Sequence, residues 1–79
     1  MSNPTIDSFG TKIWYNDKGQ NHREDGPALE FTDGDKEWWV NGKFIYCLYP
    51  NGSGFKSNLK NLTLAIKQSI IIEKLKLQQ

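Results

Sequence analysis

The residues best suited to chemistry stand together in one stretch, His22-Arg23-Glu24-Asp25. It offers a general base, a cation and two carboxylates within four residues. On an extended segment, however, alternate side chains point to opposite faces, so His22 and Arg23 diverge. The pattern therefore favours a structural role, in which Asp25 hydrogen-bonds the adjoining turn and Arg23 or His22 braces a neighbouring strand. Hydrolysis by His22 with Asp25 or Glu24, and a binding contact, are the alternatives.

Other familiar chemistries lack their residues in this sequence. His22 is the single histidine and Cys47 the single cysteine, so we expect no zinc site and no disulfide. The chain has neither a phosphate-cradling glycine loop nor a nucleophile elbow. We therefore expect a protein that is not an enzyme, with no catalytic residues, no metal and no cofactor. Cys47 lies in an apolar segment and is expected to be inert core.

Nothing in the chain predicts export or a membrane span. The N-terminus shows no basic region followed by an apolar stretch, and the longest strictly apolar run is Ile70-Ile71-Ile72. A lone cysteine also fits a reducing compartment. We expect a single domain over residues 1–79, located in the cytoplasm and not bound to membranes.

The chain carries a broken internal repeat. Lys12-Ile13-Trp14-Tyr15 returns as Lys36-Glu37-Trp38-Trp39, with Trp14 and Trp38 24 residues apart. Each copy is followed by a glycine turn, at Gly19-Gln20 and at Gly42-Lys43. A fixed period of this size is typical of stacked supersecondary units that cannot bury their apolar faces alone.

Turn signals divide the first two thirds of the chain into strands. Asn41-Gly42 is the strongest of them and predicts a two-residue hairpin turn. The segments between turns are rich in aromatic and β-branched residues, as strands are. We expect an α+β fold: an antiparallel β-meander of four or five strands over residues 10–54, with one C-terminal helix packed on one face. The segment 44–49 is apolar on both sides, so it requires cover on both.

The tail changes to a helical period. Ser57 is a plausible N-cap, and we expect a helix from Asn58 to about Leu75, within residues 57–76. One stripe, expected to pack on the sheet, consists of Leu59, Leu62, Ile66 and Ile70. A second, on nearly the opposite side, consists of Leu64, Ile71 and Leu75. A strand over 70–77 is the alternative.

The second stripe is surplus to the packing of the helix on the sheet. Loops of the same chain, a second copy or another protein could cover it, and of these we expect a partner protein, or a second copy in a homodimer through the helix. With the aromatic residues expected on the sheet face away from the helix, the predicted partner-binding residues are Trp39, Tyr49, Leu64, Ile71 and Leu75. A third stripe of lysines seven residues apart predicts, as an alternative, nucleic-acid or nucleotide binding by Lys60, Lys67 and Lys74.

Charge is unevenly distributed along the sequence. Residues 1–35 carry a net charge of −4 and residues 36–79 a net charge of +5. Such asymmetry indicates either internal complementarity or a partner with an opposite patch.

Residues 12–43 resemble a known type of repeat. Two tryptophan segments flank the run His22-Arg23-Glu24-Asp25-Gly26-Pro27-Ala28. This arrangement looks like the HREDGPA-containing repeats of small tailed-phage and large-virus proteins, which are similar to MORN hairpin repeats. The second copy departs from the pattern, because Phe44-Ile45-Tyr46-Cys47 stands where another His-Arg-Glu-Asp would follow. The resemblance implies a meander and a viral origin, and the departure of the second copy suggests a terminal repeat capped by the helix. Because small phage proteins commonly bind and block host machinery or host defences, we expect a binding protein that inhibits a host protein, with the defence proteins among the candidates.

Overall fold

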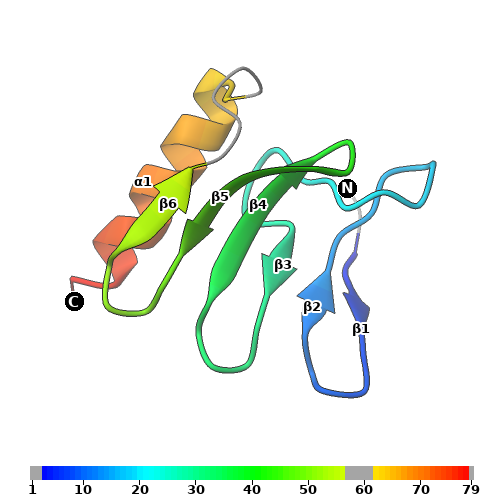
Figure 1. Cartoon of the computed structure of the whole chain (residues 1–79), viewed down its shortest axis with the longest axis horizontal. Coiled ribbons are helices and arrows are strands. Elements are labelled where there is room, and N and C mark those ends of the chain that lie inside the picture. The colour runs from blue at the N-terminus through cyan, green and yellow to red at the C-terminus, as the bar shows by residue number, and fades with distance from the viewer. Residues whose placement is uncertain (1–2, 57–61, 79) are drawn as a thin grey trace.

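The computed structural model describes residues 3–56 and 62–78 and is shown in Figure 1. These residues form β1 (Thr5–Ile6), β2 (Lys12–Ile13), β3 (Leu29–Glu30), β4 (Lys36–Val40), β5 (Lys43–Leu48), β6 (Gly54–Lys56) and α1 (Leu64–Lys76). The strands make one sheet in sequence order, and every neighbouring pair is antiparallel. The predicted α+β meander with a C-terminal helix is confirmed. The sheet also takes in β1, which precedes the predicted range.

The turn between β4 and β5 follows from its two residues. Asn41 and Gly42 both have positive φ, at 50° and 78°. Paired positive φ values are typical of the hairpin turns whose twist matches the flanking strands. A register shift between Trp38 and Trp39 interrupts the β4–β5 pairing, so Trp38 pairs with Tyr46 and Trp39 with Phe44.

The core lies between the longest strands and the helix. Its cluster of buried side chains is formed by Trp38, Ile45, Tyr46, Leu48, Ile66 and Ile70. Four consecutive residues of β5, 45–48, are buried. Both faces of this strand are therefore covered within the chain itself. Figure 1 shows α1 running along the β5–β6 end of the sheet.

The helix begins later than predicted. Its N-cap is Thr63, whose backbone is extended and whose Oγ1 accepts the N–H of Ile66 at 3.3 Å. Leu62 is therefore outside the helix, although it packs against the core. The predicted cap Ser57, together with residues 58–61, lies outside the described residues. The strand alternative for residues 70–77 is wrong, because α1 continues to Lys76.

The two apolar stripes separate as their periodicity predicts. Ile66 and Ile70 face the sheet with 0% and 8% of their surface exposed. Leu64, Ile71 and Leu75 face outward. Among the described residues, no helix combines the length and the apolar character that crossing a lipid bilayer would need.

Candidate functional site

The first copy of the repeat is organised around Trp14. Its ring is buried, and the guanidinium of Arg23 stacks over it at 3.9 Å from the ring centre. The backbone N–H of Trp14 donates to the carbonyl of Ala28 at 2.8 Å, and its carbonyl accepts the N–H of His22 at 3.0 Å. The ring is thus covered by a side chain of its own repeat. Stacking of a cation on an indole face stabilises both groups.

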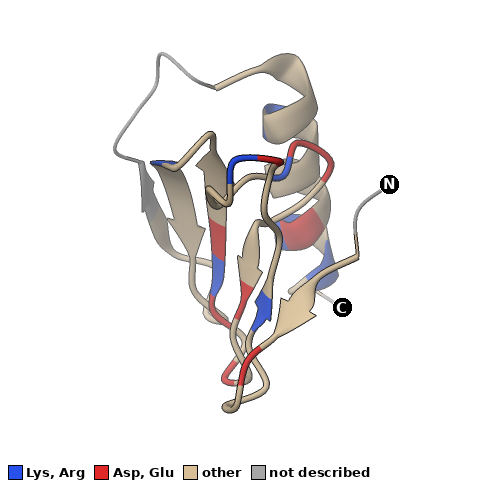
Figure 2. Ribbon diagram, turned by 90° about the vertical axis from the view of Figure 1, so that its right-hand side faces the viewer, with Lys and Arg blue, Asp and Glu red and all other residues tan. Residues whose placement is uncertain are grey.

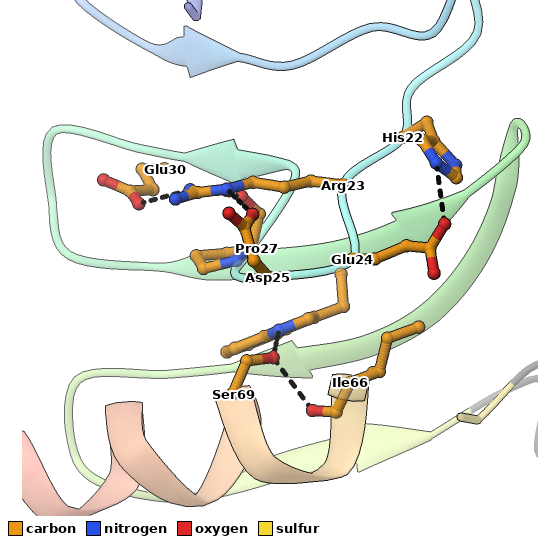
Figure 3. A network of polar contacts seen from close by, with 9 residues as sticks. His22, Arg23, Glu24, Asp25, Pro27, Glu30, Ile66 and Ser69 are labelled. Carbon is orange, nitrogen blue, oxygen red and sulfur yellow. Dashed lines mark hydrogen bonds and ion pairs between the residues drawn. The ribbon is translucent and has the colours of Figure 1, made fainter. Parts of the chain in front are cut away.

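Figure 3 shows how Arg23 is held in this position. Its Nε donates to Asp25 at 2.9 Å, and its Nη1 donates to the carbonyl of Pro27 at 3.0 Å. Nη1 also lies 3.4 Å from a carboxylate oxygen of Glu30, in β3. The fork of the guanidinium therefore ties the turn to the adjoining strand. This is the predicted bracing role, except that Asp25 acts through Arg23.

The imidazole of His22 is also engaged on both sides. Nδ1 accepts the backbone N–H of Asn41 at 3.0 Å, and Nε2 lies 3.4 Å from a carboxylate oxygen of Glu24. The neutral ring therefore carries its proton on Nε2, directed at Glu24. His22 lines a surface hollow of about 520 Å³, but neither nitrogen offers it a free lone pair. The geometry favours bracing of the β4–β5 turn over general-base chemistry.

The second copy covers its tryptophan in a different way. The buried ring of Trp38 makes an edge contact with Tyr46 at 5.7 Å between ring centres. Its Nε1 donates to the hydroxyl of Ser69 at 2.8 Å, and Ser69 in turn donates to the carbonyl of Ile66 at 2.9 Å (Figure 3). α1 thus takes the place that the Arg23 loop occupies in the first copy. Sequence reasoning missed Ser69, because a lone serine in an apolar helix gives no signal.

The predicted partner-binding residues fall on two separate surfaces. Trp39 and Tyr49 are half-buried on the sheet face opposite Trp38. Trp39 is anchored there by its Nε1, which donates to Glu37 at 2.9 Å, and by an edge contact with Phe44 at 5.5 Å. The structure therefore does not bring Trp39 and Tyr49 together with the outward residues of α1.

Tyr49 has a neighbour that links it to the core. Its side chain hydrogen-bonds the thiol of Cys47, and this bond is the main reason that the pKa of Tyr49 lies above the ordinary 10.0. Burial raises the pKa of the Cys47 thiol above 9.0. A thiol kept protonated is a poor nucleophile, which agrees with the predicted inert role.

The outward face of α1 is apolar and open. Leu64 is 70% exposed, Ile71 is 55% exposed and Leu75 is 52% exposed. Ile72, which was not predicted, is 52% exposed beside them. Large exposed apolar side chains gathered on one helix are typical of interaction sites.

A groove of about 260 Å³ runs beside this face, between α1 and β5. Its lining consists of Tyr46, Leu62, Lys67, Ile70, Ile71 and Lys74. The Nζ of Lys74 lies 5.6 Å from the centre of the Tyr46 ring. The structure thus brings two of the three predicted lysines to one groove, whereas Lys60 lies outside the described residues.

No group of three or more histidine, cysteine or acidic side chains in the described ranges 3–56 and 62–78 is placed to hold a metal. Comparisons of the chain with protein-family models, with curated proteins and with solved structures found no match. The resemblance to viral HREDGPA repeats therefore stays a prediction from the residues.

Proposed function

We propose that this chain is a small, non-enzymatic binding protein of the phage type, which occupies a surface of a host protein in the host cytoplasm and so inhibits or modulates it. The viral and host part of the proposal rests on the resemblance of residues 12–43 to viral repeats. The docking surface is the outward face of α1, defined here as Leu64, Ile71, Ile72 and Leu75.

The observation that carries the proposal is the exposure of this outward face. Each of the four side chains has at least half of its surface open to solvent. Covering a large aliphatic side chain contributes about 1.5–3 kcal/mol. Several such residues together supply a substantial part of a protein–protein affinity. The tightly braced His22–Asp25 segment supports a binding protein over an enzyme.

Affinity capture from host lysate tests the proposal. The tagged chain is compared with an Ile71→Glu/Leu75→Glu variant and with Lys76→Gln, a change at an exposed residue of the same helix that lies outside the docking surface. Nuclease treatment removes bridging nucleic acid, and circular dichroism checks that each variant is folded. We expect one protein to be recovered with the wild type and with Lys76→Gln but lost with the double variant. Equal recovery with all three chains would argue against the helix surface.

Nucleic-acid binding is the second candidate. It is favoured by the placement of Lys67 and Lys74 at one groove next to an aromatic ring. Binding to an oligonucleotide would then weaken steeply with salt, because lysines that neutralise phosphates release counterions. A Lys67→Gln/Lys74→Gln variant should reduce that salt slope, while the uncharged change Ile71→Ser should leave it unchanged.

A further inference from the structure

The outward face of α1 has the spacing of a coiled-coil seam. Leu64, Gln68, Ile71 and Leu75 follow one another at intervals of four, three and four residues, and all are exposed. In the heptad notation abcdefg, Leu64 and Ile71 occupy d positions and Gln68 and Leu75 occupy a positions. A single polar residue at an a position is a known device for setting the register of a helix pair.

The flanks of this seam differ in charge. Lys67 and Lys74 occupy successive g positions, whereas Ala65 and Ile72 occupy the e positions. Among the residues that the structure describes, neither lysine is paired with a carboxylate. Lys74 lies over the Tyr46 ring, and Glu73 of the same helix pairs instead with Lys76 at 3.1 Å. One edge of the seam is therefore positive and lacks a counter-charge of its own.

A second copy of the chain does not complement this edge. In a parallel pair, each g residue meets the e residue five positions further along the partner helix, so Lys67 would face the apolar Ile72, and Lys74 lies too near the helix end at Lys76 to meet an e residue. In an antiparallel pair, g residues meet g residues, so Lys67 and Lys74 would face the same lysines of the second copy. Like charges at facing positions are destabilising. Both arrangements leave the lysines without partners, and one adds repulsion.

The spacing of the two lysines selects a partner of matching period. Seven residues of helix span about 10.5 Å, which is one heptad of a facing helix. An extended segment covers a similar length in about three residues, which places the two end side chains on opposite faces. Carboxylates one heptad apart on a partner helix therefore match the spacing of Lys67 and Lys74. A partner side chain that lies between these two carboxylates would face the apolar part of the groove, which is lined by Tyr46, Leu62 and Ile70.

We propose that α1 pairs with an acidic amphipathic helix of another protein, through the seam Leu64, Gln68, Ile71 and Leu75 and through Lys67 and Lys74. This inference rests on the proposed function, since it names the class of partner for the same surface. The acidic half of the present chain cannot serve as that partner helix, because residues 3–35 form strands and turns (Figure 2).

Two synthetic helices test the pairing. Both carry three heptads with isoleucine at a and leucine at d. One peptide has glutamate at every e and g position and the other has lysine there, so that like charges prevent each peptide from pairing with a second copy of itself. Fluorescence anisotropy measures their binding to the wild type, to Lys67→Glu/Lys74→Glu, and to the control Lys18→Glu/Lys43→Glu, whose lysines are exposed on turns and strands of the sheet.

We expect the wild type and the control to bind the acidic helix, and the charge-reversed helix variant to bind it about tenfold more weakly and to prefer the basic helix. If the wild type binds both peptides equally and Ile71→Glu abolishes this binding, the partner is not selected by its acidic charge, but the docking surface on α1 is supported. If Ile71→Glu binds the peptides as well as the wild type does, or if the wild type binds neither peptide, both the acidic helix partner and the docking surface on α1 are contradicted. Tighter binding of an oligonucleotide than of the acidic peptide would assign the lysines to nucleic acid instead.

Discussion

Ser69 couples the helix to the sheet through a single hydroxyl. With 7% of its surface exposed, it accepts the indole N–H of Trp38 and donates to the carbonyl of Ile66. Ser69→Ala should leave the buried indole N–H without a partner and lower the free energy of unfolding by about 1–3 kcal/mol. Urea denaturation followed by tryptophan fluorescence measures this. Gln68→Ala, one residue away and exposed, should cost much less, and an equal cost would contradict the proposed coupling.

Gly26 leaves the space that Arg23 fills. A Cβ built at Gly26 lies 2.7 Å from Cζ of Arg23, which itself stacks on Trp14. Gly26→Ala should therefore displace the guanidinium and destabilise the fold by about 1–3 kcal/mol. A double-mutant cycle isolates the cause: in an Arg23→Ala background, the same glycine change should cost far less. Additive costs would show that alanine acts on the backbone instead.

Cys47 and Tyr49 give stability a defined dependence on pH. Burial raises the pKa of the thiol above 9.0 in the folded chain, so the folded state holds this proton more tightly than the unfolded state. The resulting stabilisation is complete below about pH 9 and is lost as pH rises through the raised pKa. Tyr49, raised above 10.0 chiefly by its bond to Cys47, adds a loss of the same sign at higher pH.

Denaturation at pH 7.5 and at pH 10.5 should therefore show a smaller stability difference in Cys47→Ala than in the wild type. Each chain is compared with itself at the two pH values, because all titratable groups other than Cys47 are common to both chains. The same pH sensitivity in the two chains would mean that the thiol does not contribute.

At the scale of the element, α1 packs on the sheet through one face and exposes the opposite face to solvent. Ile66, fully buried, and Ile72, 52% exposed, test this division with the same substitution. Ile66→Val should reduce stability by about 0.5–1.5 kcal/mol through the methylene lost from the core, whereas Ile72→Val should change it by less than about 0.5 kcal/mol. Thermal unfolding measures both. Similar shifts in the two variants would show that the outward face is packed in solution.

The helix also shows where sequence reasoning succeeds and where it stops. The 3.6-residue period separates Ile66 and Ile70 from Leu64, Ile71 and Leu75 correctly, because a helix long enough to be periodic carries its own signal. Periodicity alone places the helix start too early, since Leu62 fits the same period while lying outside the helix. The cap at Thr63 is a local hydrogen bond, and the periodicity of the apolar residues does not locate it.

For the sheet, turn chemistry was the informative signal. Asn41-Gly42 gives a hairpin with the paired positive φ values that the dipeptide predicts. β1 could not be foreseen, because a two-residue strand has no measurable alternation and is placed by its pairing with β2. The candidate site was predicted only in part. Periodicity finds the outward helix residues, but the groove beside Tyr46 requires knowledge of which sheet face the helix covers.

At the scale of the whole molecule, the helix is a required cover for the second tryptophan. A chain ending at residue 56 would leave Trp38 without Ser69, Ile66 and Ile70. We expect this truncated chain to lose the dispersed amide spectrum of a folded protein in nuclear magnetic resonance, and a peptide of residues 57–79 to restore it in trans. Removal of residues 78–79 alone is the control and should have no effect. A folded 1–56 fragment would show that the meander is self-sufficient.

The two ways of covering a tryptophan have an evolutionary consequence. In the first copy, the lid over Trp14 comes from within the repeat, whereas the lid over Trp38 is a separate C-terminal segment. Duplication of the first repeat would therefore lengthen the sheet without requiring a second capping helix. The outer surface of the helix could also change without disturbing the repeats that precede it. In such an arrangement, the number of repeats and the outer surface of the helix can change independently of each other.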